Sequence, residues 1–209
     1  MLQLFYPKNL RDVFTNRRSE LELLNFYKEQ HKEGNPTHLA LFGLRRIGKT
    51  LLLKELVLRL LRRDKDIIPV YMDFSDICSS PENFATGYIG QVCYWFLTKG
   101  QDKLLPYLEY RSLYAEAIKA QDDVVTRTVS QLYNELNVAK PDRQLLLRLA
   151  FSFPDELGTA HQKKFILIFD EFQEIEALKN FKETTQIISL FRANLQRQSQ
   201  VLYILSVRI

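Results

Sequence analysis

The sequence contains little cysteine, glycine or proline, and each shortage excludes a class of protein. Its 209 residues include two cysteines, Cys78 and Cys93, which cannot form a disulfide framework and suit a reducing compartment. Seven glycines and seven prolines are too few for a collagen-like or loop-rich chain. We therefore expect regular secondary structure around a hydrophobic core, held together without disulfide bonds.

The sequence also lacks a recognisable leader and a long apolar segment. The first residues, MLQLFYPKNLRD, contain no basic region followed by an apolar run, which argues against a signal peptide. The longest uncharged run, residues 83–98, is shorter than a membrane span and contains glycine and glutamine. We therefore expect a cytoplasmic protein that has no membrane segment.

Charge of either sign is only slightly in excess. The 29 basic and 25 acidic residues give a net charge of +4, which is too small to indicate a nucleic-acid partner by itself. The excess lies in the first 66 residues, which contain 14 basic and 8 acidic side chains. Two interpretations stay open for this basic segment: a solvated helix face, or a surface that contacts the phosphate backbone of a nucleic acid.

Segments with strand and helix patterns alternate along the chain. Apolar runs of strand length occupy residues 38–42, 67–74, 165–169 and 201–206. Helix patterns occupy residues 17–33 and 48–63, and the first of these ends at a Gly-Asn-Pro sequence. Such alternation predicts an α/β fold with a mainly parallel sheet flanked by helices.

About 90 residues separate the second and third predicted strands, which is far more than one crossover helix needs. We expect a helical insertion over residues 75–164, with helices starting at Pro81 and covering 103–120, 122–137 and 141–150. Asn180 and Glu183 resemble a capping box for a helix that runs to Gln196. The predicted organisation is one domain, residues 1–209, made of four parts: 1–36, 37–74, 75–164 and 165–209.

A phosphate-binding loop is the strongest motif in the sequence. Residues 43–50 match G-x-x-x-x-G-K-[ST] at every fixed position, between a predicted strand and a predicted helix. Glycines let backbone N–H groups approach phosphate oxygens, Lys49 supplies a cation for the β- and γ-phosphates, and Thr50 offers a hydroxyl to Mg²⁺. The predicted nucleotide-binding residues are Gly43, Leu44, Arg45, Arg46, Ile47, Gly48, Lys49, Thr50 and Leu51.

Two carboxylates follow the third predicted strand. Asp170 and Glu171 come directly after the apolar run FILIF. Ligands of open α/β sheets gather at the carboxyl ends of the strands, so we expect Asp170 beside Thr50, holding Mg²⁺ directly or through water. Glu171 would then orient or deprotonate the water that attacks the γ-phosphate, which makes Glu171 and Lys49 the predicted catalytic pair.

These residues resemble the archaeal-type ATPase branch of the AAA+/STAND P-loop NTPases. That group often has two arginines in its phosphate loop, as at residues 45–46, and Asp-Glu-Phe-Gln after its third strand, as at residues 170–173. The stretch YMDFSD, residues 71–76, is similar to the second strand of the family. The N-terminal box of the family is matched by Phe14, Asn16, Arg17, Glu20 and Leu21.

The resemblance implies a sheet ordered 5-1-4-3-2 and a site for ATP or ADP with Mg²⁺. It also implies that the segment from Phe14 to Arg17 lies near the adenine. From the residues alone, Phe14 could equally pack onto the following helix. Ser206, at the end of the fourth strand, is the candidate sensor of the γ-phosphate. The fifth strand, the lid and an arginine finger of the family have no counterpart that we identify.

Three functions fit this pattern. The first is Mg²⁺-dependent hydrolysis of ATP that drives a conformational change. The second is a nucleotide-dependent switch with little hydrolysis, and the third is an ATPase module that acts with a nucleic acid. Without a fifth strand, the strand that carries the phosphate loop would be a sheet edge. We therefore expect self-association or a protein partner at that edge. We also expect slow hydrolysis by this chain, because the lid and an arginine finger, which accelerates hydrolysis in related proteins, have no counterpart that we identify.

Overall fold

A four-stranded parallel sheet forms the centre of the computed structural model, which describes residues 17–209. The strands are β1 (Leu39–Gly43), β2 (Ile67–Asp73), β3 (Lys164–Asp170) and β4 (Val201–Arg208), in the order β1-β4-β3-β2. This order is the predicted one for the four strands. Among the described residues, β1 pairs only with β4 and β2 only with β3, so both are edge strands.

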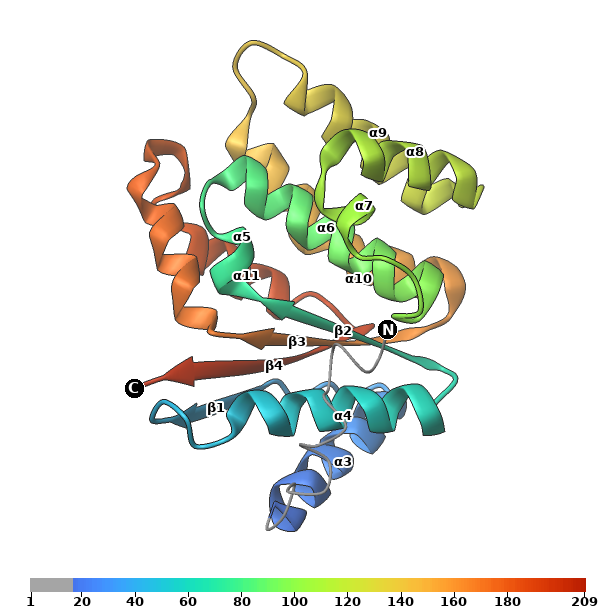
Figure 1. Cartoon of the computed structure of the whole chain (residues 1–209), viewed down its shortest axis with the longest axis vertical. Coiled ribbons are helices and arrows are strands. Elements are labelled where there is room, and N and C mark those ends of the chain that lie inside the picture. The colour runs from blue at the N-terminus through green and yellow to red at the C-terminus, as the bar shows by residue number, and fades with distance from the viewer. Residues whose placement is uncertain (1–16) are drawn as a thin grey trace.

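Helices cover both faces of the sheet (Figure 1). Helices α3 (Arg18–Lys32) and α4 (Lys49–Arg63) lie on one face, and α6 (Pro81–Thr98), α10 (Arg143–His161) and α11 (Ile187–Leu195) lie on the other. Because both faces are covered, β3 is apolar from Phe165 to Phe169 and buried from Phe165 to Asp170. The α/β prediction is therefore confirmed.

The long connection between β2 and β3 is helical, as predicted. It contains α5 (Phe74–Ile77), α6, α7 (Leu105–Leu108), α8 (Tyr110–Ala120), α9 (Asp123–Leu136) and α10. Its aromatic residues mainly build the core: Phe84, Tyr88 and Trp95 of α6 are at most 4% exposed. Within residues 17–209, no helix combines the length and the apolar character that crossing a bilayer requires.

Two predicted helix boundaries in this connection are wrong. Residues 103–120 form two helices because Glu109 adopts an extended backbone and its carboxylate accepts hydrogen bonds from the N–H groups of Arg111 and Ser112 at the start of α8. The helix predicted over 141–150 continues to His161. Pro154 lies inside it and is buried, so tertiary packing outweighs the helix-breaking tendency of proline.

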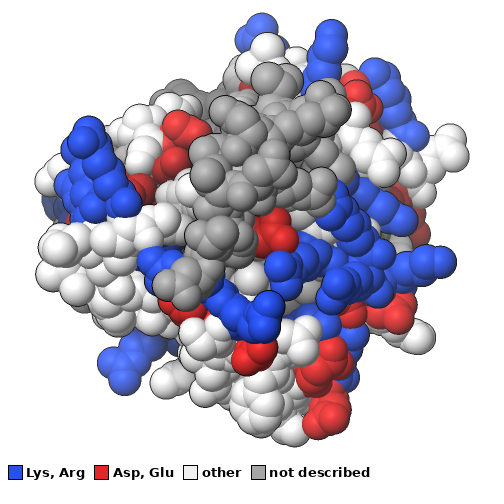
Figure 2. All heavy atoms as spheres, turned by 60° about the horizontal axis from the view of Figure 1, so that its bottom comes forward, with Lys and Arg blue, Asp and Glu red and all other residues white. Residues whose placement is uncertain are grey.

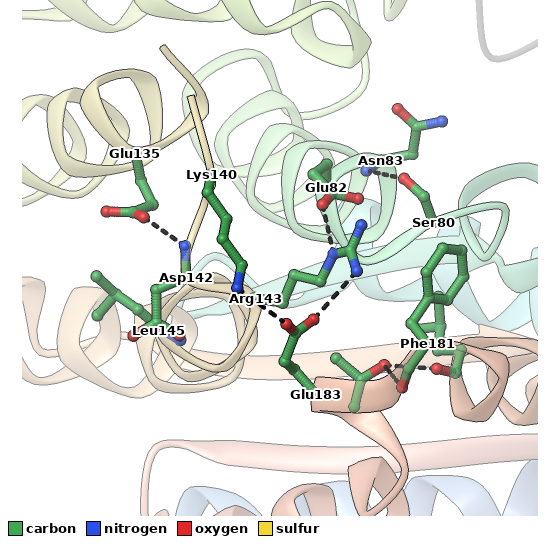
Figure 3. A network of polar contacts seen from close by, with 12 residues as sticks. Ser80, Glu82, Asn83, Glu135, Lys140, Asp142, Arg143, Leu145, Phe181 and Glu183 are labelled. Carbon is green, nitrogen blue, oxygen red and sulfur yellow. Dashed lines mark hydrogen bonds and ion pairs between the residues drawn. The ribbon is translucent and has the colours of Figure 1, made fainter. Parts of the chain in front are cut away.

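The predicted capping box at Asn180 and Glu183 is also wrong. The chain instead forms two 3₁₀ segments, η1 (Phe172–Asn180) and η2 (Lys182–Thr184), before α11 begins at Ile187. Glu183 accepts a hydrogen bond from Arg143 of α10 at 3.1 Å, and Arg143 also donates to Glu82 of α6 at 2.7 Å (Figure 3). The local sequence pattern assigns the carboxylate of Glu183 to a helix cap, but in the structure this carboxylate binds Arg143, which is distant in the sequence.

Candidate functional site

The phosphate loop joins the end of β1 to the start of α4. Its two glycines differ in backbone conformation and in their surroundings. Gly48 adopts φ +88°, a left-handed conformation that favours glycine, immediately before α4. At Gly43 a Cβ would lie 2.3 Å from Cδ1 of Ile47, which is the end of an exposed, flexible side chain and would have to move aside. The loop therefore turns tightly and brings the N-terminus of α4 to the end of the sheet.

Lys49 is the first residue of α4, and its ammonium group lies over the loop. Nζ donates to the carbonyl oxygens of Gly43 at 2.6 Å and Leu44 at 3.1 Å. A cavity of about 230 Å³ lies beside it, lined by residues 44–51 together with Glu171. The loop, its cation and one of the two predicted carboxylates thus share one small hollow at the carboxyl ends of the strands.

Asp170 lies at the end of β3 and is almost completely buried, with 1% of its surface exposed. Its Oδ2 atom accepts a hydrogen bond from Thr50 Oγ1 at 2.6 Å and another from Tyr71 Oη at 3.0 Å. Its Oδ1 atom accepts from the N–H of Glu171 at 3.1 Å. The predicted neighbours Thr50 and Asp170 are therefore in direct contact across 120 residues of sequence.

Tyr71 also belongs to this site, although it is not among the site residues predicted from the sequence. It is on β2, next to β3, and its buried hydroxyl points at Asp170. Burial, and then the negative charge of Asp170, raises the pKa of Tyr71 well above its usual value, so the hydroxyl remains protonated and donates. Tyr71 is the aromatic residue that opens the second-strand pattern YMDFSD. Its contact with Asp170 follows only from the pairing of β2 with β3.

Glu171 follows Asp170 in a left-handed backbone conformation, with φ 49°. Among the described non-glycine residues with positive φ, Lys99, Gln121 and Gln162 end helices, whereas Arg46 and Glu171 lie at the phosphate loop and the acidic strand end. Such conformations are costly and cluster at functional sites.

The side chain of Glu171 is held by Gln173. Nε2 of Gln173 donates to Oε2 of Glu171 at 2.5 Å, and Oε1 of Gln173 accepts a hydrogen bond from the backbone N–H of Arg208 at 3.1 Å. Gln173 is the last residue of the Asp-Glu-Phe-Gln pattern, and the pattern by itself assigns it no role. Its amide bridges the acidic strand end and the end of β4.

Arg17 contacts the phosphate loop from the start of α3. Its guanidinium donates to the carbonyl oxygen of Ile47 at 2.5 Å and to Glu20 at 2.6 Å. The loop is therefore tied to α3 as well as to the sheet. Phe14, the other residue predicted near the adenine, lies outside the described residues.

Ser206 is buried in β4, opposite Leu41 of β1 in the pairing register. Tyr203 packs against Phe191 of α11, and because side chains alternate along a strand, Ser206 faces the α4 side of the sheet. Its hydroxyl has no hydrogen-bond partner in the part of the chain that the structure describes. The position next to the phosphate-loop strand is compatible with the predicted sensor role, which stays a prediction.

A larger cavity, about 1150 Å³, lies between α3 and α4, and neither Asp170 nor Glu171 lines it. Figure 2 shows Lys and Arg side chains gathered on this face of the molecule, with Asp and Glu among them. The charged residues that line the cavity are Arg17, Arg18, Glu22, Lys28, Glu29, Arg59, Arg63 and Asp64. Because acidic side chains are interspersed with the basic ones, this face does not by itself favour a nucleic acid over the solvated-helix interpretation.

The sheet order, the flanking helices and the loop between β1 and α4 define a P-loop NTPase-like fold. No family model and no curated protein matches the sequence. Among solved structures, the chain is similar to a Walker-type ATPase of Pyrococcus abyssi, with a TM-score of 0.54 and 17% sequence identity. The match covers 99% of this chain and 49% of that protein, so the chain spans about half the length of its structural neighbour. At this identity the likeness concerns the fold.

Proposed function

We propose that this chain is a nucleotide-binding P-loop ATPase core that binds ATP with Mg²⁺ and hydrolyses it to drive a conformational change. The observation that carries the proposal is the contact between Thr50, at the head of α4, and Asp170, at the end of β3, beside the ammonium group of Lys49. The hydroxyl of Thr50, the buried carboxylate that it contacts and the cation of Lys49 together form a site for a phosphate chain with a divalent cation. Affiliation with the archaeal-type AAA+/STAND ATPases, and ATP as the nucleotide, are part of this proposal and rest on the resemblance.

The residues present suit magnesium bound together with a nucleotide. Oxygen ligands suit this ion, and Thr50 Oγ1 and Asp170 Oδ2 are 2.6 Å apart. Within residues 17–209, no group of three or more His, Cys, Asp or Glu side chains could hold a metal ion. Phosphate oxygens and water would therefore complete the coordination. When bound, the ion would neutralise charge that develops on the phosphates.

In this proposal the side chains have separate tasks. Lys49 leaves the loop carbonyls to contact the β- and γ-phosphates, and the backbone N–H groups of residues 44–51 surround the phosphate chain. Glu171 takes a proton from a water molecule whose oxygen attacks the γ-phosphorus. The bond from that phosphorus to the bridging oxygen breaks, and ADP and inorganic phosphate leave.

Calorimetric titration with ATP and Mg²⁺ tests the binding step. Lys49→Ala removes a charge-assisted contact worth about 2–3 kcal/mol, so ATP affinity should fall by roughly 30- to 150-fold. Lys65→Ala, which alters an exposed lysine after α4, is the matched control and should bind like the parent. Equal affinity of the parent and Lys49→Ala would contradict the proposal. Tight binding by the parent without turnover would favour the nucleotide-dependent switch.

A further inference from the structure

We propose that Gln173 is a positioning residue that holds the carboxylate of Glu171 for hydrolysis; this inference rests on the proposed function. The nitrogen and the oxygen of its side-chain amide each form a hydrogen bond. Nε2 donates to Glu171 Oε2 at 2.5 Å, and Oε1 accepts from the N–H of Arg208 at 3.1 Å. Among the described residues, no other side chain forms a hydrogen bond with this carboxylate.

The chemistry of the two partners determines which way the amide faces. A carboxylate only accepts hydrogen bonds and a backbone N–H only donates one, so the amide nitrogen must face Glu171 and the oxygen must face Arg208. A glutamate at position 173 could still accept the hydrogen bond from the N–H of Arg208. Its other carboxylate oxygen, however, would face the carboxylate of Glu171 and repel it. Leucine would make neither bond. The position is therefore specific for an amide of this length.

The second partner explains why this bond matters for the position of Glu171. Arg208 is at the end of β4 and lies opposite Gly43, the first residue of the phosphate loop, in the pairing of β4 with β1. Gln173 therefore ties the carboxylate to the strand beside the loop. Glu171 itself lies at the turn from β3 into η1, in a left-handed conformation. The amide of Gln173 therefore restrains a side chain that lines the cavity beside the phosphate loop.

Gln173 does not line the cavity formed by residues 44–51 and Glu171, so its loss should leave nucleotide affinity unchanged. An unrestrained carboxylate spends less time in the orientation that accepts a proton from water. We expect Gln173→Leu to lower kcat about tenfold and to change KM for ATP by less than about twofold. Gln173→Glu should lower kcat at least as much, because it removes the donor and adds a like charge.

A double-mutant cycle separates positioning from a general structural role. Hydrolysis is measured as kcat at saturating ATP for the parent, Gln173→Leu, Glu171→Gln and the double variant. If Gln173 acts through Glu171, adding Gln173→Leu to Glu171→Gln causes no further loss. Gln131→Leu, an exposed glutamine of α9, is the matched control, and thermal unfolding checks that each variant is folded.

Every result of this double-mutant cycle either supports or overturns the proposed role of Gln173. A tenfold loss in kcat that disappears in the Glu171→Gln background supports it. Equal losses in both backgrounds, an unchanged kcat, or a rise in kcat would overturn it, and a rise would mean that Gln173 holds Glu171 away from the water. Absence of turnover in the parent would overturn the proposed hydrolysis and this inference together, which distinguishes that failure from one confined to Gln173.

Discussion

The buried histidine of α3 predicts how the stability of the fold depends on pH. His31 is fully buried, and its Nε2 lies 3.1 Å from the carbonyl oxygen of Phe165 in β3, to which the neutral ring donates. Burial, and then the positive charge of Lys164, lowers the pKa of His31 to about 4. The native structure therefore keeps this imidazole neutral at pH values where an exposed histidine is charged.

The sign and size of the effect follow from the two pKa values. Between pH 6.5 and about 4, the unfolded chain binds a proton at His31 and the native chain does not, so the free energy of unfolding falls as the pH is lowered. At 1.36 kcal/mol per pH unit, the loss is about 2 kcal/mol at pH 5 and about 3 kcal/mol at pH 4. Above pH 6.5 this contribution to stability is fully present.

Urea unfolding at a series of pH values, for the parent and for His31→Gln, measures this loss. Glutamine can still donate to the carbonyl of Phe165 but does not titrate. His38, whose pKa is also lowered by burial, is present in both proteins, so its effect cancels in the comparison. We expect the variant to lose about 2 kcal/mol less than the parent between pH 7 and pH 5. Parallel curves for the two proteins would refute the reasoning.

Two further predictions concern the carboxylates at the end of β3. Glu171→Gln should retain ATP affinity and lower hydrolysis by about 10²–10⁴-fold, because the amide preserves the shape and cannot take the proton from water; a phosphate-release assay showing the parent rate would exclude Glu171 as the base. Tyr71→Phe removes one of the two hydroxyl donors to Asp170 Oδ2 and should lower the free energy of unfolding by about 1.5–3 kcal/mol. Chemical denaturation measures this loss. Tyr110→Phe of α8 is the comparison for the removal of a hydroxyl group, because Tyr110 is only partly buried and its hydroxyl accepts a hydrogen bond from Arg111 at the surface.

The phosphate loop could be predicted from the sequence because its determinants are contiguous. Gly43, Gly48, Lys49 and Thr50 act through local backbone geometry and the start of one helix, and the structure shows the expected strand, turn and helix around them. The approach of Asp170 to Thr50 could be predicted by a general rule, since the carboxyl ends of parallel strands meet at one edge.

Other contacts could not be predicted because they depend on how distant segments pack. Tyr71 and Asp170 are 99 residues apart, and their contact requires the register that pairs β2 with β3. Gln173 and Arg208 are 35 residues apart and meet only after the chain turns into η1. The capping-box prediction failed for the same reason, because Arg143 of α10 binds the carboxylate of Glu183.

The sequence by itself determined the α/β class, the phosphate loop and the acidic pair at the end of the third strand. Each of these features depends on residues that are close together in the sequence and on their periodicity. Only the tertiary structure decided which side chains hold the carboxylates. A hydrogen bond needs its donor and acceptor within about 3 Å, and for Tyr71, Gln173 and the N–H of Arg208 that proximity arises from strand register and the turn after β3.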